Sequence, residues 1–305
     1  MISAAMRETS GNPIMPGVGL CDPHVRVYGD RAYLYATHDR GPNGDTFAMD
    51  DWWIWSTADL VTWQHECTIR PEQTYYGKPD SSCWAVDEME RNGRHYFYFS
   101  RGPQNVGVME SDSPVGPWRD PLGKPLLAKG MVPTEIRDPG LFKDDDGTCY
   151  IVFGTFQFFL ARLNDDMISL AEPPRPIAIE RPQGPYGHGK TDDKPYLHKR
   201  DGIYYLSWGC YYGMSDSVYG PYDCRGSIID PDRIAPSLQY RGKHSADYDR
   251  HGSFFEWHGS WYFICNEMGV SQNMFFRDSS ISYVTYRSNG EIEPIFITKE
   301  GVALP

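Results

Sequence analysis

Asn92-Gly-Arg-His-Tyr-Phe-Tyr-Phe-Ser100 joins a glycine-containing turn to an aromatic-rich strand, and this pattern occurs five times in the chain. The other copies are residues 28–36, 146–154, 201–209 and 258–265. The central aromatic residues of the five copies recur at intervals of 54 to 63 residues, a little more than the usual repeat of a propeller blade. Similar strands repeated at this spacing predict similar sheets set in a ring. We therefore expect an all-β fold, a five-bladed β-propeller.

The repeats run almost from end to end of the 305 residues, so we expect residues 1–305 to form a single catalytic propeller domain. Hydrophobic residues make up 40% of the chain, which is enough for a packed core. The aromatic fraction of 14% favours β-sheets first and a sugar ligand second, since aromatic rings pack on pleated surfaces and on sugar faces. The links between the repeats are rich in proline, glycine, aspartate and asparagine, which indicates turns rather than helices.

The charge of the chain excludes two classes of partner. The formal net charge is −12 and no basic stripe stands out, which argues against nucleic acid and against an anionic membrane surface. No apolar stretch is long enough to span a bilayer. The simplest interpretation of the charge is that it keeps the protein dispersed in solution.

The cysteines indicate a reducing compartment. The chain has seven, an odd number, and none is spaced as a Cys-x-x-Cys pair. Residues 1–20 lack the apolar core of a signal peptide. We therefore expect a cytoplasmic location, with secretion as the alternative if a leader has been removed.

Three acidic residues stand out by their context. Asp22, Asp138 and Asp193 each precede a proline by one or two residues, and each proline leads into an apolar, strand-like run. Proline disfavours the helical region for the residue before it, so we expect an extended start to each strand. Because the innermost strand of each blade lines the centre of a propeller, the three carboxylates are predicted to point into one funnel.

A series of motifs carries a resemblance to a known family. In chain order they are Asn12-Pro-Ile-Met-Pro-Gly17, Cys21-Asp-Pro-His24, Tyr33-Leu-Tyr-Ala-Thr-His-Asp39, Cys83-Trp-Ala-Val-Asp87, Arg137-Asp-Pro-Gly-Leu-Phe142, Asp144-Asp-Asp-Gly147, two Ser-Asp-Ser-x-x-Gly-Pro turns and His251-Gly-Ser253. Their order and spacing resemble glycoside hydrolase family 43, the five-bladed propeller family of arabinofuranosidases, arabinanases and β-xylosidases. The resemblance covers nearly the whole chain.

The resemblance implies roles for the three acids. Asp22 matches the general base and Asp138 matches the acid that tunes and orients the general acid. The general acid of the family is normally the Glu of a Glu-Gly-Pro motif, and this chain has Asp193-Lys194-Pro195 there. Asp193 would then be the acid, with a shorter side chain and a cation beside it. Three other carboxyls stay open as alternatives: Asp192, Glu135 and Glu267.

The resemblance also implies binding residues. His251 matches a histidine that in many members holds a water-coordinated calcium ion, which would be the only cofactor; no organic cofactor and no catalytic zinc are expected. Four further residues are candidate substrate contacts: His38, Asp39, Trp84 and Arg277. Trp84 offers an apolar platform for a sugar face, and Arg277 looks like the arginine that reaches the hydroxyls of the terminal sugar.

The chemistry that fits these residues is glycoside hydrolysis. It needs a protonated carboxyl at the leaving oxygen and a carboxylate that activates water on the opposite face. We expect an inverting, exo-acting glycosidase that removes a terminal sugar from oligosaccharides, with α-L-arabinofuranose as the first candidate. A β-xylosidase or galactofuranosidase of the same fold stays open. A carbohydrate-binding propeller without catalysis also stays open, because Asp193-Lys194 departs from the Glu-Gly of the family's general-acid motif. A platform for protein partners would leave the three acids unexplained.

Overall fold

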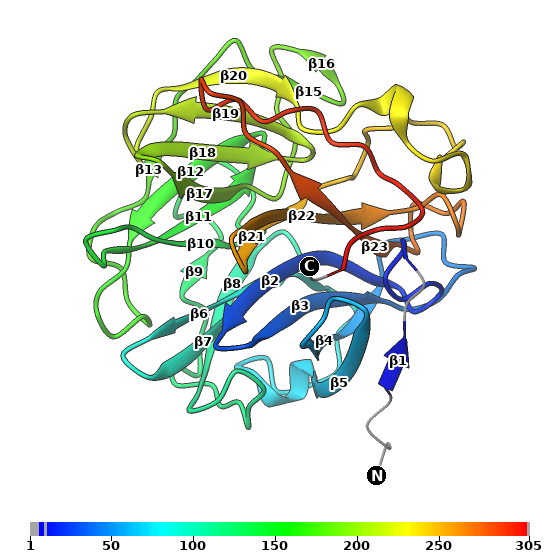
Figure 1. The fold of residues 1–305 in the computed structure, drawn as a ribbon. Coiled ribbons are helices and arrows are strands. Elements are labelled where there is room, and N and C mark those ends of the chain that lie inside the picture. The colour runs from blue at the N-terminus through cyan, green and yellow to red at the C-terminus, as the bar shows by residue number, and fades with distance from the viewer. Residues whose placement is uncertain (1–5, 9–10, 304–305) are drawn as a thin grey trace.

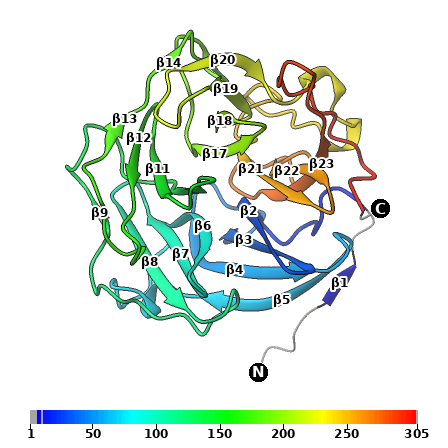
Figure 2. The ribbon, with the colours of Figure 1, turned by 60° about the vertical axis from the view of Figure 1, so that its left-hand side comes forward.

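The computed structural model describes residues 6–8 and 11–303 (Figures 1 and 2). Within these residues the regular structure is almost entirely strand, apart from three single-turn 3-10 helices at Pro71–Gln73, Pro231–Arg233 and Pro236–Leu238. Figure 2 shows five sheets arranged around a common centre. The expected all-β, five-bladed propeller is thus confirmed. No helix in the described part of the chain is long and apolar enough to cross a membrane.

Apart from the outer edge strands of blades 1 and 4, the strands of each blade are antiparallel and follow one another in sequence from the centre outward. Blade 1 contains β2 (Leu20–Tyr28), β3 (Arg31–Asp39), β4 (Met49–Thr57) and β5 (Thr62–Ile69), with β1 (Met6–Glu8) at its outer edge. Blade 2 contains β6 (Cys83–Arg91), β7 (Arg94–Arg101), β8 (Asn105–Ser111) and β9 (Leu127–Ala128). Blade 3 contains β10 (Gly140–Lys143), β11 (Cys149–Thr155), β12 (Gln157–Arg162) and β13 (Arg175–Pro176).

The last two blades are less alike. Blade 4 contains β17 (Tyr196–Arg200), β18 (Ile203–Trp208), β19 (Tyr211–Ser215) and β20 (Tyr222–Ser227), with β14 (Ile179–Glu180) paired parallel at the outer edge. Blade 5 has three strands, β21 (Gly252–Trp257), β22 (Ser260–Glu267) and β23 (Asp278–Val284). A separate two-stranded ribbon joins β15 (Gln183–Gly184) to β16 (Gly187–His188).

The repeated sequence pattern is the inner hairpin of each blade. The aromatic-rich runs are the second strands, β3, β7, β11, β18 and β22, which lie largely within the core. The turns before them need left-handed backbone: φ is +55° at Asn92 and +78° at Gly93, and two other copies also have two successive positive values. Two-residue hairpin turns of this kind match the twist of the strands and favour Asn-Gly or Asp-Gly. The turn explains why glycine recurs in the pattern.

The ring of innermost strands closes on itself. Strand β2 contacts β6 on one side and β21 on the other, while β10 contacts β6 and β17, and β17 contacts β21. The segment before β2 fastens blade 5 to blade 1. The Asn12 side chain accepts a hydrogen bond from the Ile281 amide at 2.9 Å and donates one to the Ile281 carbonyl at 3.0 Å. Asn12 thereby acts as a short strand partner for β23.

A buried ion pair joins three blades near the centre. Arg26 on β2 donates to both carboxylate oxygens of Asp87 on β6, at 3.1 and 2.6 Å, and also to the Leu141 carbonyl on β10 at 2.9 Å. The Leu141 amide in turn donates to Asp87 at 2.7 Å. The Asp87 side chain is fully buried and the Arg26 side chain is 18% exposed. This network holds the inner strands of blades 1, 2 and 3 in register.

Replacing Arg26 by Met should lower the free energy of unfolding by about 3–5 kcal/mol, because it leaves the Asp87 carboxylate buried without its cation. Urea unfolding followed by fluorescence measures the loss. Arg26→Met combined with Asp87→Asn is the control, and it should recover a large part of the stability since no charge is then stranded. A loss below about 1 kcal/mol in the single variant would contradict this account of the centre.

Candidate active site

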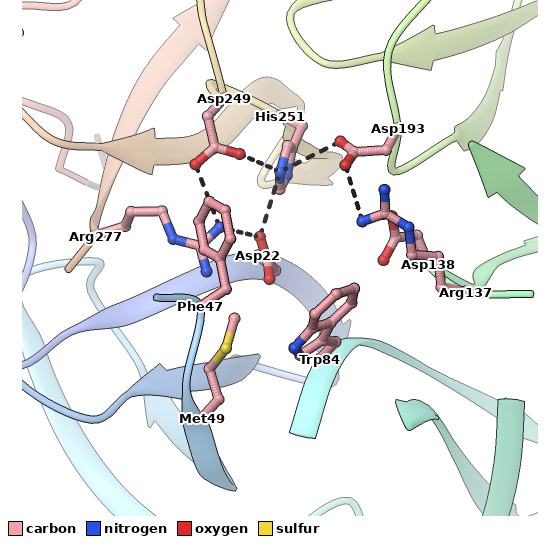
Figure 3. A pocket seen from close by; sticks show the side chains of 10 residues that line it. All are labelled: Asp22, Phe47, Met49, Trp84, Arg137, Asp138, Asp193, Asp249, His251 and Arg277. Carbon is pink, nitrogen blue, oxygen red and sulfur yellow. Dashed lines mark hydrogen bonds and ion pairs between the residues drawn. The ribbon is translucent and has the colours of Figure 1, made fainter. Parts of the chain in front are cut away.

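A pocket of about 360 Å³, including the open space at its mouth, lies where the innermost strands of the blades begin (Figure 3). The residues that line it are Asp22, Phe47, Met49, Trp84, Arg137, Asp138, Asp193, Asp249, His251 and Arg277. They come from all five blades or from the segments leading into them. The structure therefore brings together the three acids singled out in the sequence, with Trp84, His251 and Arg277.

The backbone at the strand starts is left-handed rather than extended. φ is +50° at Asp22, +59° at Asp138 and +50° at Lys194, each directly before a proline. The extended start expected from the prolines is therefore wrong at these three positions. Non-glycine residues in this region cost about 1–3 kcal/mol each and persist where the surroundings fix them, typically at functional sites. These φ values also show that Lys194, not Asp193, occupies the backbone position equivalent to Asp22 and Asp138.

Asp22 is a buried carboxylate held by cations. Its Oδ1 accepts from Arg277 Nη1 at 3.2 Å and from Asn266 Nδ2 at 3.2 Å, and its amide donates to Asn266 Oδ1 at 2.7 Å. Burial alone would raise the pKa of Asp22, but the charges of Arg277, His251 and Lys194 outweigh it and lower the pKa to about 2. Asp22 is therefore ionised at neutral pH.

His251 lies between three carboxylates. Its Nε2 is 2.9 Å from Asp249, 3.4 Å from Asp22 Oδ1 and 3.7 Å from Asp193 Oδ1, as the dashed lines in Figure 3 mark. Burial opposes a charge on the ring, yet the surrounding carboxylates raise the pKa of His251 to about 9. Because both distances are measured from the same nitrogen, Asp22 Oδ1 and Asp193 Oδ1 lie at most about 7 Å apart.

Asp138 lies near the other two acids and is harder to ionise. Its Oδ2 accepts the Lys194 amide hydrogen at 3.2 Å and lies 3.6 Å from Arg137 Nη1. Burial raises the pKa of Asp138 to about 6; Arg137 opposes this, while the charges of Asp193 and Asp22 add to it. Asp138 therefore titrates close to neutral pH beside two other carboxyls.

Asp193 is the most accessible of the three acids, with 21% of its side chain exposed. Its Oδ2 lies 3.1 Å from Arg137 Nη1. Arg137 is itself held by Glu135, whose Oε2 is 2.9 Å from Arg137 Nε, and its guanidinium lies 5.3 Å from the centre of the Trp84 ring. Arg137 thus fixes the direction of the Asp193 carboxylate at the edge of the pocket.

The Lys194 ammonium lies beneath Asp22, not beside Asp193. The side chain is buried, and its Nζ donates to the Asp22 carbonyl at 3.0 Å and contacts His24 Nδ1 at 3.0 Å. Burial lowers the pKa of His24, so its ring is neutral and accepts from Lys194 through Nδ1. His24 Nε2 then faces Asp87 at 3.7 Å. The expectation that Lys194 places its cation beside Asp193 is wrong, because the left-handed backbone turns the Lys194 side chain toward the central axis; the cation beside Asp193 is Arg137.

Two predicted substrate residues line the pocket and two do not. Trp84 and Arg277 are in the lining, but Arg277 is buried and largely used by Asp39, to which its Nε and Nη2 donate at 3.1 Å. Asp39 therefore orients Arg277 from behind the pocket. His38 pairs with Asp51 at 2.9 Å outside the lining and stacks on a neighbouring indole.

The alternative acids also lie outside the pocket lining. Asp192 is buried, and burial together with the adjacent Asp193 raises its pKa. Glu135 is paired with Arg137, as described above. Glu267 accepts the amide hydrogens of Gly269 and Val270, which fixes the turn after β22. Asp193 is therefore the acid that the geometry favours.

Sequence reasoning missed four lining residues: Phe47, Met49, Arg137 and Asp249. Asp249 accepts from both His251 and Arg277, and its φ of +54° gives it the left-handed backbone of the other blade starts. No proline follows it, so the shared proline pattern did not find it. Its place two residues before His251 was the available signal.

The residues around His251 do not form a direct metal site. In the part of the chain that the structure describes, no three histidine, cysteine, aspartate or glutamate side chains are arranged to hold an ion. His251 Nε2 is bound to Asp249, and its Nδ1 is buried without a hydrogen-bond partner. The donor set therefore does not fit a directly coordinated calcium ion, which prefers six to eight oxygens. The chemistry derived below uses none.

The chain is similar to several known proteins. Residues 10–292 match the family model described as glycosyl hydrolases family 43. A xylosidase/arabinosidase from Bacteroides ovatus is 26% identical over 96% of this chain and 99% of the relative. A β-D-galactofuranosidase from Aspergillus niger is 29% identical over 96% of this chain and 87% of the relative.

A solved structure has the same fold. It is a family 43 β-xylosidase/α-arabinofuranosidase from a compost microbial metagenome, in complex with xylotriose in a calcium-free form. The two structures share 24% identity with a TM-score of 0.77, over 96% of this chain and 99% of that one.

Replacing Asp138 by Asn should stabilise the protein at pH 7. The folded pKa of about 6 lies above the ordinary value of 3.8, so protonation of Asp138 favours folding below pH 3.8 and this gain is lost as the pH rises through 6. Asn mimics the neutral form, and should raise the free energy of unfolding at pH 7 by about 1–3 kcal/mol. Urea unfolding at pH 7 and pH 4 tests this, with the difference shrinking toward zero at pH 4. A variant that is less stable at pH 7 would refute the assignment.

Proposed function

The chain belongs to glycosyl hydrolase family 43 and is a glycosidase, and from this premise we propose that it removes terminal α-L-arabinofuranosyl units from oligosaccharides with inversion. The observation that carries the proposal is the group of three carboxylates, Asp22, Asp138 and Asp193, which three blades bring to one small pocket. Glycoside hydrolysis needs two carboxyls on opposite sides of the scissile bond, and a third to control protonation.

Asp22 serves as the general base. Its carboxylate is ionised and is oriented by Asn266 and Arg277, so it stands ready to take a proton from an attacking water. The buried Lys194 ammonium holds the Asp22 carbonyl from below, which fixes the strained backbone that directs the carboxylate into the pocket. Water approaches the sugar on the side of Asp22.

Asp193 serves as the general acid on the opposite side. It is the most accessible of the three acids and lies at the pocket edge, with its Oδ1 no more than about 7 Å from Asp22 Oδ1 across His251. Asp138 lies near Asp193 in the same pocket, and burial, with the charge of Asp193 adding to it, raises the pKa of Asp138 to about 6. The ion pair between Asp193 and Arg137 has to loosen as Asp193 takes up the proton that it later donates.

The size of the pocket favours an exo-acting enzyme. The pocket holds only about 360 Å³ even with the open space at its mouth included, which suits one terminal sugar rather than several. Phe47, Met49 and Trp84 give that sugar apolar contacts, while Arg277 faces its hydroxyls. Arabinose is named in two of the similar proteins, and xylose in the same two, so a β-xylosidase is the second candidate. The galactofuranosidase relative keeps a third sugar in view.

Calcium and location are further proposals. A calcium ion near His251 would have to be held through water, and no catalytic step is assigned to it.

All seven cysteines lie within the described residues and none forms a disulfide, which supports a reducing, cytoplasmic compartment.

Hydrolysis of p-nitrophenyl α-L-arabinofuranoside, β-D-xyloside and β-D-galactofuranoside tests the proposal. The wild-type protein should act best on the arabinofuranoside, and Asp22→Asn should lower kcat by about 10³-fold or more because no base remains to activate water. Asp45→Asn, at an exposed loop position outside the pocket, is the matched control and should behave as wild type. No hydrolysis of any of the three substrates would favour a binding protein instead.

Replacing Lys194 by Gly should lower kcat about tenfold while the protein stays folded. Glycine accepts the positive φ without strain, so the change removes the ammonium and keeps the backbone. Without that cation the pKa of Asp22 rises, and the acid limb of the pH profile of kcat/KM moves to higher pH. Lys243→Gly, at an exposed lysine, should leave the profile in place. An unchanged profile in Lys194→Gly would contradict a role for Lys194 in holding Asp22.

A further inference from the structure

The Lys194 side chain places a positive charge on the central axis, directly beneath the pocket. Only 1% of the residue is exposed, and its ammonium donates to the Asp22 carbonyl at 3.0 Å and contacts His24 Nδ1 at 3.0 Å. Both of these partners are uncharged, since burial lowers the pKa of His24 and leaves its ring neutral. A buried ammonium is costly unless negative charges compensate it. The compensation here comes from carboxylates that surround the ammonium at longer range.

Three carboxylates from three blades supply this compensation. Asp22 lies in β2, Asp87 lies in β6, and Asp138 comes just before β10. Burial lowers the pKa of Lys194, and the negative charges of these three acids oppose that effect. Lys194 itself leads into β17 of the fourth blade. The ammonium is therefore a cation at the point where the charges of four blades meet.

The backbone at Lys194 shows what this cation costs the chain. Its φ of +50° is strained for every residue except glycine. The Lys194 amide donates to Asp138 Oδ2 at 3.2 Å, and a glycine at this position could make the same hydrogen bond. A glycine would, however, leave the axis without the charge and without the four-carbon chain that carries it. The side chain, rather than the backbone, is thus what the lysine contributes.

A second cavity leads from the opposite face of the propeller toward the ammonium. It encloses about 1000 Å³, open space included, and is lined by the far halves of the five innermost strands. Arg26 and Tyr196 are among its lining residues. Arg26 donates to Asp87, and the Tyr196 ring lies 5.2 Å from the ring of His24, which contacts the ammonium. One layer of side chains therefore separates the ammonium from a solvent-filled opening.

We propose that the Lys194 ammonium is the built-in cation of this active site: it stabilises the base Asp22 and the acid Asp138 as a bound metal ion could, so that hydrolysis needs no divalent cation. The inference rests on the proposed glycosidase function and deepens it, because it assigns the electrostatic support of the catalytic acids to a side chain. The contacts of His251 agree with it, since its Nε2 is taken by Asp249 and is not free to hold a metal ion.

Chemical rescue of Lys194→Gly tests this proposal. The substitution removes a group with the size and charge of n-butylammonium, and should lower kcat on p-nitrophenyl α-L-arabinofuranoside about tenfold. Added n-butylammonium should restore most of that loss with a saturable dose dependence. It should also raise the thermal unfolding midpoint of this variant and leave that of the wild type unchanged. Tetramethylammonium at the same concentration has the charge but no N–H donor, and should do neither.

Lys194→Met is the matched control, since it keeps the length and the strained backbone and removes only the charge. It should lose as much kcat as Lys194→Gly, and n-butylammonium should not restore it because the space is filled. Wild-type kcat and unfolding midpoint should also survive dialysis against EDTA.

Three results would overturn the built-in cation: full activity of Lys194→Met, no response of Lys194→Gly to n-butylammonium in either measurement, or a loss of wild-type activity in EDTA that calcium reverses. If Lys194→Gly does not fold, Lys194→Met and the EDTA experiment still decide. An inactive wild-type protein would overturn the proposed function instead, since the unfolding midpoint of Lys194→Gly reports on the cation without any hydrolysis.

Discussion

Charges buried along the central axis are the constraint on which this structure depends. From the middle of the channel toward the pocket the chain of contacts runs through Arg26, Asp87, His24, Lys194 and Asp22. Each charged group is expensive to remove from water unless a partner of opposite charge or a hydrogen bond replaces the water. Most of these contacts join different blades, so the axis satisfies its charges only when the ring is closed. Closure and the arrangement of the catalytic acids are thus parts of one network.

The same network explains the strained backbone of the pocket. Sheets are most regular within the blades, whereas the residues just before the innermost strands adopt left-handed conformations at Asp22, Asp138, Lys194 and Asp249. Such conformations persist only where surrounding contacts fix them. Here Lys194 supplies two of those contacts, one through Nζ to Asp22 and one through its amide to Asp138. A residue that departs from the family pattern therefore links the base to the tuning acid, and the acid Asp193 directly precedes it in sequence.

The sequence predicted the architecture because each blade repeats a local signal. A positive-φ turn followed by a buried aromatic strand is a short-range pattern, so Asn92-Gly93 and its counterparts could be recognised without knowledge of the rest. The gathering of Asp22, Asp138 and Asp193 followed from their common place before a blade.

The direction of a side chain was harder to predict. Lys194 was expected beside Asp193, but its left-handed backbone turns it to the axis. Asp39 was expected at the substrate, yet it holds Arg277 from another blade. Arg137 was missed because its partner Asp193 leads into another blade, and Asp249 was missed because its partner Arg277 lies 28 residues away in sequence. These are long-range pairings that a local pattern does not encode.

The central claim, that Asp193 is the general acid, is tested most directly by measuring how the activity of Asp193→Asn depends on the leaving group. A good leaving group such as 2,4-dinitrophenolate departs without a proton, whereas a sugar alcohol needs one. The account predicts a small loss of kcat/KM on the dinitrophenyl glycoside and a loss of about 10²-fold or more on an oligosaccharide. An equal loss on both substrates would contradict it and move the acid to another residue.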